Sequence, residues 1–143
     1  MKSTDTVKIT EAISSAEISF FELHQGAFPI YEEFRKRLQA EFPDTQVRVQ
    51  KTQITFTNPK VYACVSFLPL RKKAERPENF IVITFGMEFE LKSPRIDVTV
   101  EPYPDRWTHH VLISNPEEID DELMQWIEDS YAFSKQKHRI RRN

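Results

Sequence analysis

Glycine is scarce in this chain, which has only Gly26 and Gly86 among 143 residues. Phosphate-binding loops and dinucleotide folds need several glycines in a short span, because backbone N–H groups must come close to the phosphates. The two glycines here lie far apart, so the common motifs for ATP, GTP, NAD and FAD are excluded. Nine prolines mark the turns instead. We predict no cofactor.

The length and composition are those of one globular domain. A chain of 143 residues with 39% hydrophobic and 29% charged residues is ordinary for a domain with its own core, and eleven phenylalanines predict an aromatic-rich interior. We expect a flexible start over residues 1–14, a single domain over residues 15–135 and a basic tail over residues 136–143.

Cysteine content and the N-terminus bear on location. One cysteine, Cys64, cannot form an internal disulfide, so nothing indicates an oxidising compartment. The first residues open no apolar run of the signal-peptide type, and no stretch approaches the ~20 apolar residues that cross a bilayer. The sequence therefore predicts a cytoplasmic protein with no membrane partner.

Helix signals stand at both ends of the chain. Ser14 and Glu17 form a capping box that opens a short helix. After Pro29, an apolar stripe predicts a second helix, with Ile30, Phe34 and Leu38 at every fourth position. Asn115, Pro116 and Glu118 form another box, which predicts a long helix from about Pro116 to Ser134. Its apolar face comprises Ile119, Leu123, Trp126, Ile127 and Tyr131.

The middle of the chain is strand-like, with short turns between apolar runs. Alternation breaks near Lys51-Thr52, where we expect a bulge or a turn. Ile96, Val98 and Val100 alternate with polar residues, so we expect these three to face the core. The other strand segments are 47–49, 54–56, 61–68, 80–85 and 107–113. The order predicts an α+β fold: N-terminal helices, an antiparallel sheet of about five strands, and a long C-terminal helix on one face.

The strong catalytic and metal-binding patterns are absent from the sequence. The four histidines and Cys64 lack the spacings of zinc sites, so we predict no metal. Cys64 lies in an apolar strand and is expected to be a small buried hydrophobe. No Gly-x-Ser-x-Gly elbow of a serine hydrolase occurs. Glu88 and Glu90 share strand parity, and we expect them to be solvated edge residues rather than a catalytic pair.

The candidate binding residues are Lys51, Trp107 and His109. Trp107 and His109 are two apart on a predicted strand and so share one face. Lys51 lies where alternation breaks, and such breaks re-aim side chains towards sites. Together a cation, an imidazole and an indole would suit a planar or anionic ligand. The alternative is that His109 and Trp107 are core residues and Lys51 is solvated.

Basic residues cluster in two further segments. Arg71, Lys72 and Lys73 lie in a polar loop and are candidates for phosphate or nucleic-acid binding. The last nine residues hold five lysines and arginines and no acid, in a chain whose net charge is −2. A nucleic-acid arm and a solvated tail both fit this composition.

Several segments resemble a family of small bacterial domains of unknown function over residues 15–135. The similar segments are Ala27–Leu38, Gln50–Phe56, Arg106–Val111, Glu118–Asp120, Trp126-Ile127 and Ser130-Tyr131. Members of the family stand alone or follow nuclease-like domains, and some are labelled "predicted transport protein". The resemblance implies a helix–sheet–helix fold without established catalytic residues. Its motif positions here are Lys51, Trp107, His109 and Asp120.

Three functions remain open at this stage. The leading hypothesis is a non-enzymatic binding or interaction module, with another protein or a small molecule as partner. The second is a helix-grip pocket, in which a curved sheet wraps the C-terminal helix around a small molecule. The third is a nucleic-acid accessory protein that uses the basic loop and tail.

The chain should tolerate removal of its basic tail. Residues from about Gln136 onward offer no apolar face that could dock on the domain. Deletion should therefore lower the melting temperature by less than about 5 °C, measured by circular dichroism. A larger drop would mean that the tail is structural.

Overall fold

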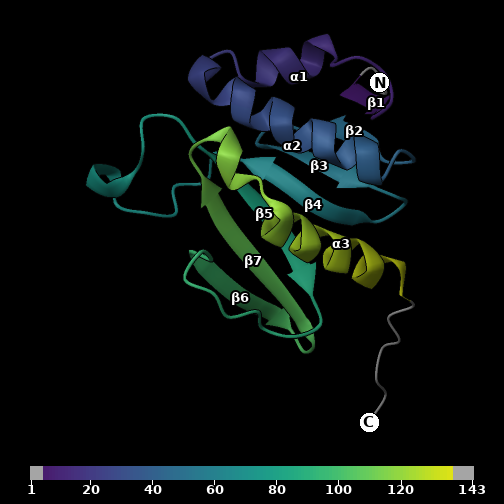
Figure 1. The fold of residues 1–143 in the computed structure, drawn as a ribbon, viewed down its shortest axis with the longest axis vertical. Coiled ribbons are helices and arrows are strands. Elements are labelled where there is room, and N and C mark those ends of the chain that lie inside the picture. The colour runs from purple at the N-terminus through teal and green to yellow at the C-terminus, as the bar shows by residue number, and fades with distance from the viewer. Residues whose placement is uncertain (1–4, 137–143) are drawn as a thin grey trace.

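The computed structural model describes residues 5–136 as an α+β fold (Figure 1). In chain order the elements are β1 (Thr6–Lys8), α1 (Ser15–Phe20), η2 (Gln25–Ala27), α2 (Phe28–Glu41), β2 (Gln46–Val49), β3 (Gln53–Thr57), β4 (Val61–Ser66), η3 (Lys73–Glu75), β5 (Ile81–Met87), β6 (Val98–Tyr103), β7 (Arg106–Ile113), η4 (Pro116–Glu118) and α3 (Asp121–Lys135), where η marks a 3-10 turn. Within the described residues, no helix is both long enough and apolar enough to cross a membrane.

All seven strands form one antiparallel sheet in the order β1-β2-β3-β4-β5-β7-β6, rather than the expected sheet of about five. The first of the seven is β1, which pairs with β2 through Val7 and Val47. The chain after β1 is fastened to the helices, because Arg35 of α2 donates to the carbonyls of Ile9 and Glu11 at 3.0 and 3.2 Å. A side chain from another element thus helps to order a segment whose own sequence is only weakly strand-like.

The helices cover one face of this sheet (Figure 1). The predicted stripe on α2 is buried, with Ile30, Phe34 and Leu38 no more than 2% exposed, and Leu123 and Ile127 of α3 are fully buried. The Ser14–Glu17 capping box is present at the start of α1. The helical patterns therefore predicted correctly that these five side chains join the core.

The C-terminal helix begins five residues later than expected. The Asn115 box is present, but it opens only the 3-10 turn η4. The backbone leaves the helical region at Ile119 (φ −85°, ψ 82°), and Asp120 then caps α3 by accepting a hydrogen bond from the Leu123 N–H at 3.0 Å. Two caps in succession, rather than one, divide the segment into a turn and a helix.

Strand β6 faces the opposite way from our expectation. Val98 and Val100 pair with His110 and Thr108, on the side of the sheet away from the helices, and Val100 is 45% exposed. The physical reason is position: β6 is an edge strand, whereas α3 packs mainly on β4 and β5. An apolar side chain at this edge has little core to face.

Helix α3 completes the sheet where β4 and β5 separate. These strands pair through Cys64–Ser66 and Val82–Thr84. Beyond that stretch, the Ser130 hydroxyl donates to the Tyr62 carbonyl at 2.8 Å and accepts from the Gly86 N–H at 3.1 Å. One side chain thus satisfies two buried backbone groups that a strand partner would otherwise bind.

Replacing Ser130 with alanine should destabilise the domain, because two buried backbone groups lose their partner. We expect a loss of about 1–3 kcal/mol in the free energy of unfolding, measured by urea titration. Ser134→Ala is the matched control on the same helix, since that buried hydroxyl bonds only to the Tyr131 carbonyl within α3. A similar loss in both variants would contradict the bridging role.

Candidate functional site

The most promising cavity is a groove of about 660 Å³ at one end of the sheet, which we call the sheet-end groove. It lies where the end of α1, the β2–β3 turn and the end of β4 come together, and it extends over β5 and β7. Its lining includes three aromatic or imidazole rings, Phe20, His24 and Phe67, and the polar residues Lys51, Thr84 and His110.

Three rings form a column along one wall of the groove. Phe67 stacks on Phe20 with ring centroids 5.3 Å apart and on His24 with centroids 3.9 Å apart, at interplanar angles of 18° and 20°. Phe67 is half-buried against the core, whereas His24 is exposed. The column therefore ends in an imidazole that is open to solvent, and a planar ligand could extend the stack.

Polar groups line the rest of the groove. Lys51 lies in the turn between β2 and β3 and is exposed, so the predicted break in alternation is a turn. Thr84 and His110 face each other across β5 and β7, with Thr84 Oγ1 and His110 Nδ1 2.8 Å apart. Burial lowers the pKa of His110, so its ring is neutral at pH 7. No carboxylate binds this histidine among the described residues, so the pair lacks the third member of a hydrolase triad.

The three predicted binding residues do not line one cavity. Lys51 lines the sheet-end groove together with His110. His109 and Trp107 instead pair with Phe85 and Met87 of β5, and all four point towards the helix layer. Because neighbouring residues on a strand face opposite sides, the groove has the adjacent histidine rather than the predicted one.

His109 is a core residue in the structure. It is fully buried, and its ring stacks on Phe85 at 5.1 Å, which in turn stacks on Trp126. Its Nε2 accepts a hydrogen bond from the Leu91 N–H at 2.9 Å. Burial lowers the pKa of His109, although the Phe85 backbone and the charge of Glu90 oppose the shift. The ring is therefore neutral at pH 7, with its proton on Nδ1.

The basic loop offers fewer free cations than its sequence suggests. Arg71 is bound to Asp97 at 2.8 Å, and this carboxylate raises the pKa of the guanidinium. Lys72 and Lys73 are exposed and form no ion pair with the described residues. Of the predicted tail, only Gln136 lies within the described part of the chain, and residues 137–143 lie outside it.

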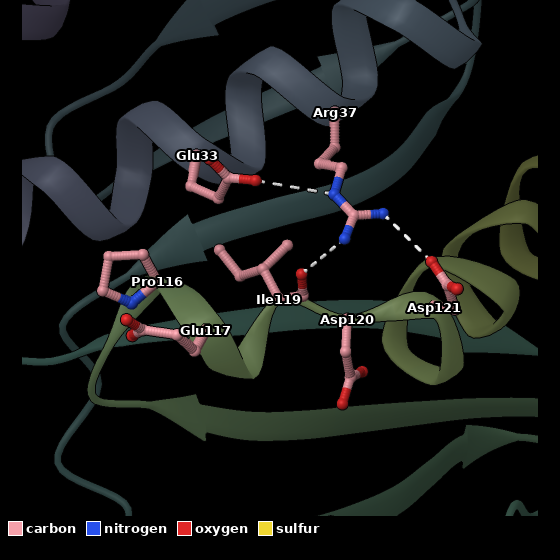
Figure 2. Close-up of a pocket in the computed structure, with 7 residues that line it drawn as sticks. All are labelled: Glu33, Arg37, Pro116, Glu117, Ile119, Asp120 and Asp121. Carbon is pink, nitrogen blue, oxygen red and sulfur yellow. Dashed lines mark hydrogen bonds and ion pairs between the residues drawn. The ribbon is translucent and has the colours of Figure 1, made fainter.

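A second groove, of about 500 Å³, separates α2 from the segment that leads into α3 (Figure 2). Figure 2 shows Arg37 held by Glu33, by the Ile119 carbonyl and by Asp121. Asp120, a motif position of the resemblance, caps α3 and binds Arg95 at 2.9 Å. Burial would raise the pKa of Asp120, but these hydrogen bonds lower it overall. The polar groups here hold helices together.

The remaining candidate groups form no reactive centre. Burial raises the pKa of Cys64 to about 11, although Arg106 opposes the shift, so the thiol is protonated at neutral pH. Glu88 and Glu90 are exposed, and Glu90 pairs with Lys92 at 3.4 Å. In the described part of the chain, no cluster of three or more histidine, cysteine or acidic side chains could hold a metal ion.

Sequence reasoning missed His24 and Phe67. His24 follows a short helix and Phe67 ends an apolar strand, so neither has a local pattern that marks a site. Forty-three positions separate them in the chain, and only the packing of α1 against the end of β4 brings their rings together. No single-sequence signal predicts this contact.

His109 should contribute to acid destabilisation. Its pKa in the folded state lies below the ordinary value, so as the pH falls the unfolded chain takes up the proton first. The contribution to the free energy of unfolding is constant above about pH 6.5 and falls below it by at most about 1.4 kcal/mol per pH unit. His109→Gln should remove this part of the pH dependence in urea titrations.

His110→Gln is needed as a companion variant, because burial lowers the pKa of His110 as well. The glutamine at position 109 keeps an oxygen that can accept from the Leu91 N–H. If His109→Gln leaves the difference in stability between about pH 7.5 and pH 5 unchanged, His109 does not titrate as the structure indicates.

Comparison with known proteins gives one match. Searches of curated proteins and of solved structures find no similar protein. The family described as "Domain of unknown function (DUF5655)" matches residues 19–134. This range includes α2, every strand from β2 to β7 and almost all of α3. The chain therefore belongs to the DUF5655 family.

Proposed function

We propose that this domain is a non-enzymatic binding module whose ligand lies in the sheet-end groove and carries a planar ring and a negative charge. The observation that carries the proposal is the ring column Phe20–Phe67–His24, which ends at an exposed face. A ligand ring stacked on His24 gains aromatic contact. Lys51, in the same groove, supplies a positive charge for an anionic substituent.

The interface between the sheet and α3 is less suited to a ligand. A helix-grip pocket would need space there, but Phe85, Leu123 and Ile127 fill this layer and are at most 2% exposed. The sheet-end groove, by contrast, is open and lined by both rings and polar groups. Open, partly aromatic clefts with a few polar groups are where small molecules usually bind.

We further propose that the module acts in the cytoplasm of a bacterial cell. A non-enzymatic role is supported by the protonated thiol of Cys64 and by the Thr84–His110 pair, which lacks a carboxylate partner within the described residues.

Binding of 1-naphthoate, a planar anion, tests the proposal by NMR titration of the ¹⁵N-labelled protein. We expect shifts at the amides of His24, Lys51, Phe67 and His110. Lys51→Gln should weaken binding of naphthoate about 2–5-fold and leave the neutral 1-naphthamide unaffected. His24→Ala should weaken both compounds, by about 2–10-fold.

Lys36→Gln is the matched control, since Lys36 is exposed on α2 and does not line the groove. It should bind both compounds like the unchanged protein. Shifts confined to amides outside the groove, or equal effects of Lys51→Gln and Lys36→Gln, would remove the support for a site here.

A further inference from the structure

The sheet has a second face, opposite the one on which the helices pack, which we call the open face; α3 reaches it at Arg106, whose guanidinium lies 5.5 Å from the Phe133 ring. Core-facing residues such as Val47, Ile54 and Ile83 alternate along their strands with residues that point the other way. The register of the strands gives the open-face positions of β1–β5 and β7: Thr6, Lys8, Gln46, Arg48, Gln53, Thr55, Thr57, Cys64, Ser66, Val82, Thr84, Gly86, Arg106, Thr108, His110 and Leu112.

None of these open-face positions is acidic, although the chain contains 22 aspartates and glutamates. Nine of the acids lie on α2, η4 and α3: Glu32, Glu33, Glu41, Glu117, Glu118, Asp121, Glu122, Glu128 and Asp129. The open face instead carries Lys8, Arg48 and Arg106 among hydroxyl and amide side chains. Charge is therefore segregated between the two sides of the domain, which the net charge of −2 conceals.

Two grooves meet at the hairpin of β2 and β3 on this side. The first, of about 640 Å³, includes Arg48, Val49 and Gln50 in its lining, and the sheet-end groove continues with Lys51, Thr52 and Gln53. Each groove thus has an exposed cation, Arg48 in one and Lys51 in the other. A small ligand would occupy one groove, whereas a linear polyanion could follow both.

We infer that the open face binds single-stranded nucleic acid, with phosphates near Lys8, Arg48 and Lys51 and one base stacked on His24. This inference rests on the proposed function, because the base occupies the same groove. Cationic grooves that follow the backbone, combined with rings that stack on bases, are how proteins bind single strands without sequence preference. A polypeptide of acidic residues alone, such as poly-glutamate, would use the cations but has no ring to place on His24.

Acidic residues at the edges of the two grooves limit the path that the nucleic acid can take. Asp5 lies in the first groove and Glu22 in the second. Asp97 lies beside β7, where it accepts from the Leu112 N–H, but its charge is balanced by Arg71. The phosphates should therefore pass between these edges, beside the exposed Arg48 and Lys51.

The test is fluorescence anisotropy with the full chain and a fluorescein-labelled oligothymidylate of about 15 nucleotides, over a series of salt concentrations. We expect binding whose log K falls with log salt by about 0.7 for each phosphate contact. Arg48→Gln, Lys51→Gln and Lys8→Gln should each weaken binding and reduce that slope by about 0.7. His24→Ala should weaken binding about 5-fold or more with the slope unchanged.

Two controls separate this face from charge elsewhere. Lys36→Gln removes the same charge from α2 and should leave binding unchanged. A variant with Lys137, Arg139, Arg141 and Arg142 replaced by glutamine tests the basic C-terminal segment, and its binding should keep the dependence on Arg48 and His24. If that variant loses all binding, or if Lys36→Gln acts like Arg48→Gln, the open face is not the site.

Other outcomes distinguish this inference from the proposed function. Poly-glutamate that binds as well as the oligonucleotide, with the same loss in His24→Ala, would overturn nucleic acid as the partner. Failure of the oligonucleotide to bind at low salt, while naphthoate still shifts the groove amides, would overturn the inference and leave the proposed function intact. Failure of both probes would overturn both.

Discussion

The fold depends on one buried ionic network between the first two helices. Glu17, Tyr31 and Arg35 are at most 3% exposed; Arg35 Nε lies 2.6 Å from a Glu17 carboxylate oxygen that also accepts from the Tyr31 hydroxyl. Burial would raise the pKa of Glu17, but the hydrogen bonds from Arg35, Ser14 and Tyr31 lower it overall. Loss of one partner from such a network typically costs about 3–5 kcal/mol, because a buried charge is left uncompensated. The same glutamate completes the capping box of α1, so one side chain sets both where the helix begins and how it packs on α2.

That network also positions the candidate site. Arg35 fastens the segment after β1 through two carbonyls, and Glu17 fixes α1, whose last residue is Phe20. Phe20 therefore reaches Phe67 from a helix that this network holds in place, and His24 reaches it from the turn between α1 and η2. Two groove residues, Lys51 and His24, are exposed, whereas Phe20 and Phe67 pack against the core. Lys51 and His24 are therefore the groove residues that can be replaced with little effect on the fold.

Local signals in the sequence predicted local structure well. They failed where residues distant in the sequence determine which face of a strand is buried. The Ser14–Glu17 box and the stripe through Ile30, Phe34 and Leu38 depend only on neighbours within one or two turns, and the structure contains both. The facing of Val98 and Val100 depends on how far α3 reaches across the sheet. Lys51 shares a groove with His110 rather than His109 because of which face of the sheet the groove lies on. Alternation along a strand shows which residues share a face, but it does not show which face is buried. Parity rightly placed Trp107 and His109 on one face, but that face belongs to the core.

The chain has only two glycines, and the structure shows why one of them, Gly86, is needed. Neither has a positive φ, and the one described left-handed residue is Asp105, in the turn between β6 and β7 (φ 64°). Gly86 is required by close approach instead: a Cβ atom there would lie 2.9 Å from the Arg106 guanidinium carbon, and that guanidinium rests on the Phe133 ring at 5.5 Å. The Gly86 N–H donates to the Ser130 hydroxyl oxygen rather than to β4. Glycine is thus used where α3 and the end of β7 converge on β5, rather than to cradle a phosphate. We therefore propose that an anion on the open face is held by side chains, Arg48 and Lys51 among them.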